Sequence, residues 1–140
     1  MIISAPGMKK PGVKTDALAE LVDLYPTLVE LCGLPKAEGL DGKSLGPVLD
    51  DPAARVKKGA CTQHPRPAYF SGSPEVMGRS VRTARYRYTE WRDFKTGKLV
   101  ATELYDHDKD PLETVNISGA PSSEAVLAEC RKIHREGFPR

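Results

Sequence analysis

The amino-acid sequence predicts an α+β fold in which a small antiparallel β-sheet of about three or four strands packs against a C-terminal helix. Residues 77–91 are dense in strand-forming side chains, and a second strand-like run follows a Lys-Thr-Gly-Lys turn. Near the C-terminus, apolar residues recur at helical spacing. A strand and a helix are expected ahead of this sheet.

Composition limits the possible partners. The chain has 140 residues, which is enough for one domain with a real core, and its 12 glycines and 12 prolines indicate short elements and long loops. The net charge of +2 is too small to draw the whole protein onto nucleic acid, and no apolar run approaches the length that spans a membrane. We therefore expect no nucleic-acid partner, no membrane partner, and only a local anion site.

The N-terminal part should contain one strand and one helix. Met1–Ala5 is apolar and precedes Pro6-Gly7, which predicts a buried strand; this start lacks the pattern of a signal peptide or an anchor, so the compartment stays open. The helix should begin with Asp23 as its N-cap, because Pro26 then falls in the first turn, where its missing N–H is no loss. It should end at Gly33.

Residues 34–58 are broken by glycines and prolines and are expected to form a connector. Four apolar side chains should attach it to a core: Leu40, Leu45, Val48 and Leu49.

The sheet is expected to be a meander. Gly59–His64 alternates weakly and predicts a short strand that leads into Pro65-Arg66-Pro67, a stiff segment that should stay outside the sheet ladder. Met77–Trp91 reads as a hairpin with its turn at Ala84 and Arg85, and Val100–Tyr105 predicts a third antiparallel strand.

The C-terminal helix should start at a Ser122 or Ser123 cap, run to about Arg135, and stop at Gly137. Its buried face is predicted to consist of Val126, Leu127, Cys130 and Ile133.

Four arginines on the predicted hairpin raise the question of an anionic ligand, since guanidinium groups bind sulfate, phosphate or carboxylate through two parallel hydrogen bonds. The alternative is that they only keep a half-exposed sheet soluble. Strand alternation puts Ser80 and Arg82 on one face and Met77, Arg79 and Val81 on the other. Arg79 and Arg82 are therefore not expected to bind the same group.

Several other kinds of site are disfavoured. Asp106, Asp108 and Asp110 imitate the start of a calcium loop, but Pro111 stands where the loop needs glycine, so these aspartates should cap turns instead. The pair formed by Cys61 and His64 has no second pair to complete a zinc site. No nucleophile motif is visible. We assign no catalytic residue and no metal ligand.

Two weaker patterns complete the survey. Tyr86, Tyr88 and Trp91 lie among arginines, as in proteins that bind single-stranded nucleic acid, but the wider basic face of such proteins is missing. Asn116-Ile117-Ser118 satisfies the glycosylation pattern, which matters only in a secreted eukaryotic protein.

Six segments of the chain form a pattern when they are taken together. They are IISAPG at 2–7, LVDLYPTLVELCGLP at 21–35, LDGKSLGPVL at 40–49, TQHPRP at 62–67, MGRSVRTARYRYTEW at 77–91 and ELYDHDKDPLETVNI at 103–117. This set resembles the C-terminal part of sulfatases of the alkaline-phosphatase superfamily, in particular the iduronate-2-sulfatase-like branch. The segments at 21–35 and 103–117 are general to many sulfatases, whereas those at 62–67 and 77–91 resemble the iduronate-sulfatase type.

The resemblance implies that the catalytic groups of the complete enzyme lie outside this chain. In such enzymes a cysteine or serine in a C/S-x-P-x-R motif becomes the formylglycine nucleophile, beside a calcium ion held by Asp, Asn and His residues. Cys32, Cys61 and Cys130 each lack the following x-P-x-R. This chain alone is expected to be inactive, with calcium bound only in the complete enzyme. Residues 1–58 would then be the last strand, helix and connector of the large α/β sulfatase domain, and residues 59–140 the C-terminal subdomain.

The resemblance also implies that the subdomain lies at the mouth of the active site and helps to select the sulfated sugar or other sulfate ester. Arg82 is the leading candidate contact. As a free-standing chain, the protein could instead be a non-catalytic binding module for sulfated glycans or other polyanions. It should self-associate or bind an upstream catalytic segment. The candidate substrate-binding residues are Gln63, His64, Arg66, Arg79 and Arg82.

Overall fold

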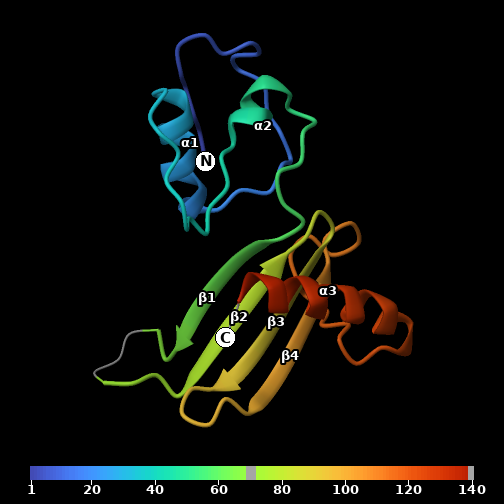
Figure 1. Ribbon diagram of the computed structural model, residues 1–140. Coiled ribbons are helices and arrows are strands. Elements are labelled where there is room, and N and C mark those ends of the chain that lie inside the picture. Colours follow the sequence, from blue (N-terminus) through green and yellow to red (C-terminus); the bar gives the residue numbers. More distant parts are fainter. Residues whose placement is uncertain (69–71, 139–140) are drawn as a thin grey trace. The chain divides into compact units, whose positions relative to one another are not determined.

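The computed structural model describes residues 1–68 and 72–138. The chain divides into two compact units, Met1–Lys58 and Gly59–Arg140. Figure 1 shows the helices of the first unit and the sheet and long helix of the second. No helix in the described part of the chain combines the length and apolar character needed to cross a bilayer. That residues 1–58 belong to a larger sulfatase domain stays a prediction.

The first unit contains a 3-10 turn, η1 (Leu21–Asp23), and two helices, α1 (Leu24–Leu31) and α2 (Gly46–Asp50). Asp23 is the N-cap of α1, as predicted, although its carboxylate accepts the N–H of Glu20 rather than an N–H of α1. Gly33 ends the helix with φ of 63°, and the N–H of Leu34 bonds back to the carbonyl of Val29 at 3.0 Å. Glycine is favoured here because the left-handed conformation is strained for other residues.

Two predictions for this unit are wrong. Residues 1–5 form no strand, because the only sheet found in residues 1–68 and 72–138 is the one in the second unit, and an unpaired strand leaves its backbone groups unsatisfied. The predicted connector contains α2, where Pro47 lies in the first turn and Val48 packs inward. Leu45 and Val48 are buried with Val29 of α1, while Leu40 is exposed.

A buried ion cluster joins the start of α1 to the end of the unit. Asp23 is fully buried; its carboxylate accepts the N–H of Lys43 at 2.9 Å and lies 2.6 Å from Nζ of Lys57. The same ammonium is 2.5 Å from Glu20. Burial alone would lower the pKa of Lys57, but hydrogen bonds to Asp23 and Glu20, and the charges of both, raise it above the ordinary value.

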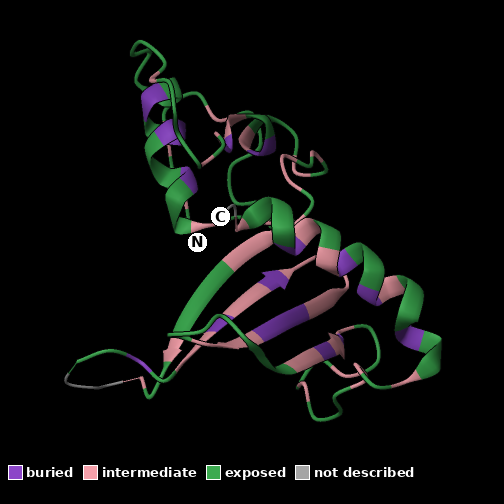
Figure 2. Ribbon diagram, turned by 60° about the horizontal axis from the view of Figure 1, so that its bottom comes forward, coloured by how far each residue is buried: buried purple, intermediate pink, exposed green. Residues whose placement is uncertain are grey.

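The second unit is a four-stranded antiparallel meander in the order β1-β2-β3-β4, which confirms the predicted topology. Helix α3 (Glu124–Gly137) follows a 3-10 turn, η2 (Pro121–Ser123), and lies across one face of the sheet (Figures 1 and 2). The strands are β1 (Ala60–Arg66), β2 (Val76–Arg82), β3 (Tyr86–Asp93) and β4 (Leu99–Asp106).

The core of this unit is a row of three side chains on neighbouring strands. Val81 pairs with Tyr88, and Tyr88 pairs with Leu104; each is at most 1% exposed. Leu127 and Cys130 of α3 complete the buried cluster. Because side chains alternate along each strand, this row decides which residues face α3 and which face away.

Two details of this unit differ from the prediction. Pro65 and Arg66 belong to β1, opposite Met77 and Val76, so the proline does join the ladder. It can do so because β1 is an edge strand, where a missing N–H can lie on the unpaired side. Helix α3 does begin after Ser123, but it extends through Gly137 and also buries His134, which the sequence reading missed.

The buried ion cluster of the first unit generates a stability prediction. Lys57→Met should leave the carboxylate of Asp23 buried without its cation and destabilise the first unit by about 3–5 kcal/mol. Loss of hydrogen-exchange protection at the α1 amides would report it. Lys9→Met is the matched control, because the Lys9–Asp50 pair is exposed and should be worth about 0–1 kcal/mol. Equal protection in both variants would contradict this account.

His134 generates a prediction of pH dependence. Burial lowers its pKa; Glu90 and the hydrogen bond to the Arg79 carbonyl oppose the shift, while the charges of Arg79 and Arg92 add to it. A lowered pKa means that the folded state binds the proton less well than the unfolded state. The stability that neutral His134 contributes is therefore complete above its unfolded pKa and is lost as the pH falls through its folded pKa.

Urea unfolding of the second unit between pH 7.5 and pH 5 should show this decline, and His134→Gln should flatten it. His64→Gln is the control because His64 is exposed. If His64→Gln flattens the curve and His134→Gln does not, the assignment is wrong.

Candidate functional site

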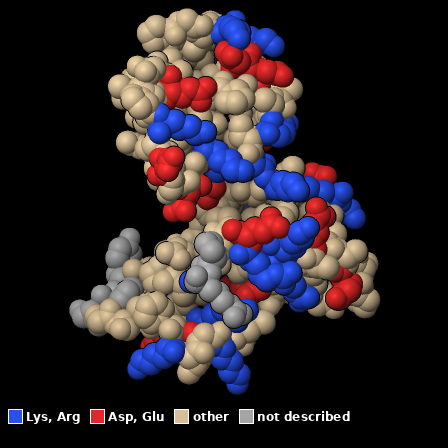
Figure 3. Space-filling model, in the orientation of Figure 1, with Lys and Arg blue, Asp and Glu red and all other residues tan. Residues whose placement is uncertain are grey.

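The face of the sheet turned away from α3 gathers polar and charged side chains, and we call it the outer face. Its members follow from the strand register, since Gly78 pairs with both His64 and Trp91, and Arg82 pairs with Arg87. Figure 3 shows the opposite side of this unit, the side of α3, where basic and acidic side chains are interspersed. The outer face carries His64, Arg66, Gly78, Ser80, Arg82, Arg87, Thr89, Trp91 and Glu103.

The structure separates the five candidate residues into two groups. His64, Arg66 and Arg82 lie on the outer face, whereas Gln63 and Arg79 pair with each other on the face covered by α3. The guanidinium carbon of Arg79 lies 5.4 Å from the ring centroid of Phe138. The backbone carbonyl of Arg79 accepts a hydrogen bond from Nε2 of His134. As strand alternation predicted, Arg79 and Arg82 point to opposite faces.

Arg82, the leading candidate from the sequence, serves the hairpin turn. Its Nη1 donates to the carbonyls of Thr83 at 2.5 Å and Tyr86 at 3.3 Å. Burial, followed by the charge of the paired Arg87, lowers the pKa of Arg82, with Glu113 and Asp108 opposing the shift. Nη1 of Arg82 therefore stabilises the hairpin turn, and fewer of its N–H groups are left to bind a ligand.

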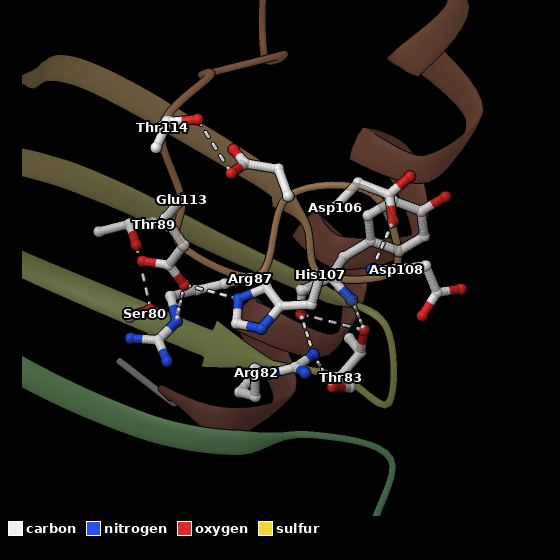
Figure 4. A network of polar contacts seen from close by, with 12 residues as sticks. Ser80, Arg82, Thr83, Arg87, Thr89, Asp106, His107, Asp108, Glu113 and Thr114 are labelled. Atoms are coloured by element: carbon white, nitrogen blue, oxygen red, sulfur yellow. Dashed lines mark hydrogen bonds and ion pairs between the residues drawn. The ribbon is translucent and has the colours of Figure 1, made fainter.

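Arg87 is neutralised by a residue that the sequence reading did not assign. Figure 4 shows the carboxylate of Glu113 between Arg87 and His107. One carboxylate oxygen lies 2.8 Å from Nε of Arg87 and 2.6 Å from Nε2 of His107. Glu113 has φ of 57°, in the left-handed region. The signal available in the sequence was the ELYD-DP-E-N segment, which contains both Glu113 and His107.

Arg85 and the three aspartates at the end of β4 and just after it, Asp106, Asp108 and Asp110, have structural partners. Arg85 binds Asp106 through two parallel hydrogen bonds of 2.7 and 2.6 Å, and this pairing lowers the pKa of Asp106. Asp110 accepts from the hydroxyl of Thr114 and the N–H of Val115, and Asp106 accepts the N–H of Asp108, so the prediction of turn-capping aspartates is confirmed for these two. Within residues 1–68 and 72–138, no three His, Cys, Asp or Glu side chains could hold a metal ion together.

The remaining candidate motifs also find their places. Cys61 pairs with Val81 of the core row, so it faces α3, whereas His64 lies on the outer face. They cannot share a zinc ion. Asn116 of the glycosylation pattern bonds to the edge of β4 in both directions, accepting the N–H of Leu104 at 3.0 Å and donating to the carbonyl of Thr102 at 3.1 Å.

Arg66 and Trp91 form a stack at the β1 side of the outer face. The guanidinium carbon lies 5.3 Å from the ring centroid of the indole. The indole N–H donates to Glu103 on β4 at 3.0 Å. A Cβ at Gly78 would lie 2.6 Å from the indole, so only glycine lets the ring approach the β2 backbone this closely.

The fold and its site define a small α+β domain whose sheet carries one helix-covered face and one charged face. Comparison with known proteins gives the family: residues 1–136 match the sequence profile described as N-sulphoglucosamine sulphohydrolase, C-terminal. The chain belongs to this sulfatase family, which confirms the resemblance found in the sequence.

The individual relatives of the chain are also sulfatases. The chain is 33% identical over 122 residues to arylsulfatase K of Danio rerio, a match that covers 84% of this chain and 22% of the relative. It is 33% identical over 156 residues to iduronate 2-sulfatase of Mus musculus, covering 86% and 28%. A solved structure of a 2-O GAG sulfatase matches with a TM-score of 0.62 and 31% identity, covering 81% of this chain and 23% of that one. The chain thus spans about a quarter of the length of these relatives.

Proposed function

We propose that this chain is the C-terminal region of an iduronate-2-sulfatase-like sulfate-ester hydrolase and that it contacts the negative groups of a sulfated sugar. The observation that carries the proposal is the outer face, where three of the five candidate residues, His64, Arg66 and Arg82, point to the same side of a domain of a sulfatase family. His64 and Arg66 are neighbours on this face, whereas Arg82 pairs with Ala60 at the opposite end of β1. Guanidinium groups suit the carboxylate and sulfate oxygens of such sugars.

The names of the relatives support the substrate class. The mouse relative is an iduronate 2-sulfatase, and the structural relative is a 2-O GAG sulfatase. We therefore propose a glycan that contains a sulfated uronic acid as the substrate of the complete enzyme. Gln63 and Arg79 lie on the other face of the sheet, so neither would reach a ligand held on the outer face.

In this proposal the reactive groups come from elsewhere in the complete enzyme. None of the three cysteines is followed by x-P-x-R, so none fits the formylglycine motif. Asp106 and Asp110 have their carboxylates occupied by Arg85 and by turn N–H groups, which does not suit them as calcium ligands. Calcium would be held by residues outside this chain, whose own role would be to bind and orient the substrate.

The first unit supports the expected partner, an upstream catalytic segment or a second copy of the chain. Helix α1 buries Thr27 and Val29 yet leaves large apolar side chains exposed on other sides, and a contiguous exposed apolar patch commonly marks an interaction site. The most exposed large apolar side chains of η1 and α1 are Leu21 at 80%, Tyr25 at 58% and Leu28 at 57%.

The alternative is a non-catalytic binding module for sulfated glycans or other polyanions, which the exposed cations of the outer face also suit. Genomic DNA just upstream of the Met1 codon separates the two proposals. A coding segment with a C/S-x-P-x-R motif favours the hydrolase, and its absence favours the module.

Two assays of the purified chain test the proposed role. It should not hydrolyse 4-nitrophenyl sulfate, because the nucleophile is missing. It should bind a heparin tetrasaccharide, more weakly as salt is added, because the contacts are charged. Hydrolysis would overturn the claim of catalytic incompleteness. Failure to bind at low salt would remove the support for substrate contacts.

A further inference from the structure

The arginines of the second unit differ in how many of their donors are free. Arg85 is held by Asp106, Arg87 by Glu113, and Arg82 by carbonyls of its own turn. Among the residues that the structure describes, Arg66 has neither a carboxylate partner nor a hydrogen-bond acceptor; its contact is with the indole of Trp91. It is also exposed, on an edge strand.

The stack with Trp91 limits the motion of this guanidinium without using its N–H groups. Attraction between the cation and the ring face holds the guanidinium near the indole, while its N–H donors stay available. A cation ordered before binding loses less conformational entropy when an anion arrives. Arg66 therefore combines free donors with a fixed position.

Three strands build the support beneath Arg66. The indole reaches from β3 across Gly78 of β2, where a side chain would collide with it. Glu103 of β4 fixes the ring by accepting its N–H at 3.0 Å. Glu103 bonds the indole and, within the described residues, forms no ion pair with Arg66. His64 lies two residues away on the same face of β1, about 7 Å along the strand.

We propose that Arg66, held over Trp91, is the principal oxyanion contact of this chain, and that Trp91 and Glu103 are its positioning residues. The inference rests on the proposed function and sharpens it, because it replaces Arg82 with Arg66 as the leading contact. The ligand is an oxyanion on a sugar ring, either a uronate carboxylate or a sulfate ester. Both present two oxygens to the fork of donors.

Fluorescence tests the proposal directly, because Trp91 is the only tryptophan in the chain. Titration of the full chain with a heparin tetrasaccharide at low salt should change the indole emission. Arg66→Gln should weaken binding at least about tenfold, the effect of losing a charge-assisted hydrogen bond. The affinity of Arg66→Lys should lie between those of the wild type and Arg66→Gln, because lysine keeps the positive charge but lacks the planar set of guanidinium donors.

Arg79→Gln is the matched control. Arg79 is also an arginine stacked on an aromatic ring, 5.4 Å from that of Phe138, but on the face covered by α3. Its variant should bind like the wild type. A hyaluronan tetrasaccharide, which has carboxylates and no sulfate, distinguishes the two sources of the oxyanion. Arg66-dependent binding of hyaluronan indicates the carboxylate, and binding of heparin alone indicates the sulfate.

The positioning role has its own readout. By calorimetry, Trp91→Phe should bind the heparin tetrasaccharide more tightly than Trp91→Leu, because phenylalanine restores a ring beneath Arg66. Equal loss in both variants, with the hairpin amides still protected from exchange, would overturn that role.

The outcomes separate the two levels of the claim. If the wild type binds and Arg82→Gln is weakened while Arg66→Gln is not, the inference about Arg66 is overturned and the proposed function stands. An equal loss in Arg66→Gln and Arg79→Gln would also overturn it, since general charge would then explain binding. If the wild type does not bind, the proposed function itself fails.

Discussion

The packing of Tyr88 between Val81 and Leu104 is the contact on which the second unit depends. These three side chains form one row across β2, β3 and β4, and α3 closes over them through Leu127. Burying a side chain of this size stabilises a fold by about 1.5–3 kcal/mol. A one-residue slip of β3 would move Tyr88 to the outer face, so the row fixes the register as well as the stability.

The same constraint determines the chemistry of the opposite face. Once Val81 points toward α3, its neighbours Ser80 and Arg82 must point away, and the register carries this choice to β1 and β3. Arg66 and Trp91 meet on the outer face for this reason, although 25 positions separate them in the chain. The apolar core thus places a guanidinium over an indole without contacting either.

Most arginines of this sheet are structural. Arg85 binds Asp106, the last residue of β4, and Arg87 binds Glu113 in the loop that follows, so these pairs tie the end of β4 and its loop to the β2–β3 hairpin. Arg82 satisfies carbonyls at the hairpin turn. Density of arginine along a strand is therefore a poor guide to an anion site, and the number of free donors on each guanidinium is a better one.

Local patterns in the sequence predicted the hairpin, β4 and α3 well, because strand formers, turn residues and helical spacing act within a few residues of each other. Contacts between distant segments were not predictable in this way. The strand expected at residues 1–5 requires a neighbouring strand, and α2 depends on packing against α1. For the site, alternation correctly separated Arg79 from Arg82, but the sequence could not show that Arg82 serves its own turn.

The central claim is that oxyanions bind the outer face of the sheet, at Arg66. Nuclear magnetic resonance of the ¹⁵N-labelled chain during addition of a heparin tetrasaccharide tests it most directly. The account predicts that the largest shifts fall on the indole N–H of Trp91 and on the amides of His64 and Arg66, with little change along α3. Shifts concentrated on Gln63, Arg79 and α3 would contradict it.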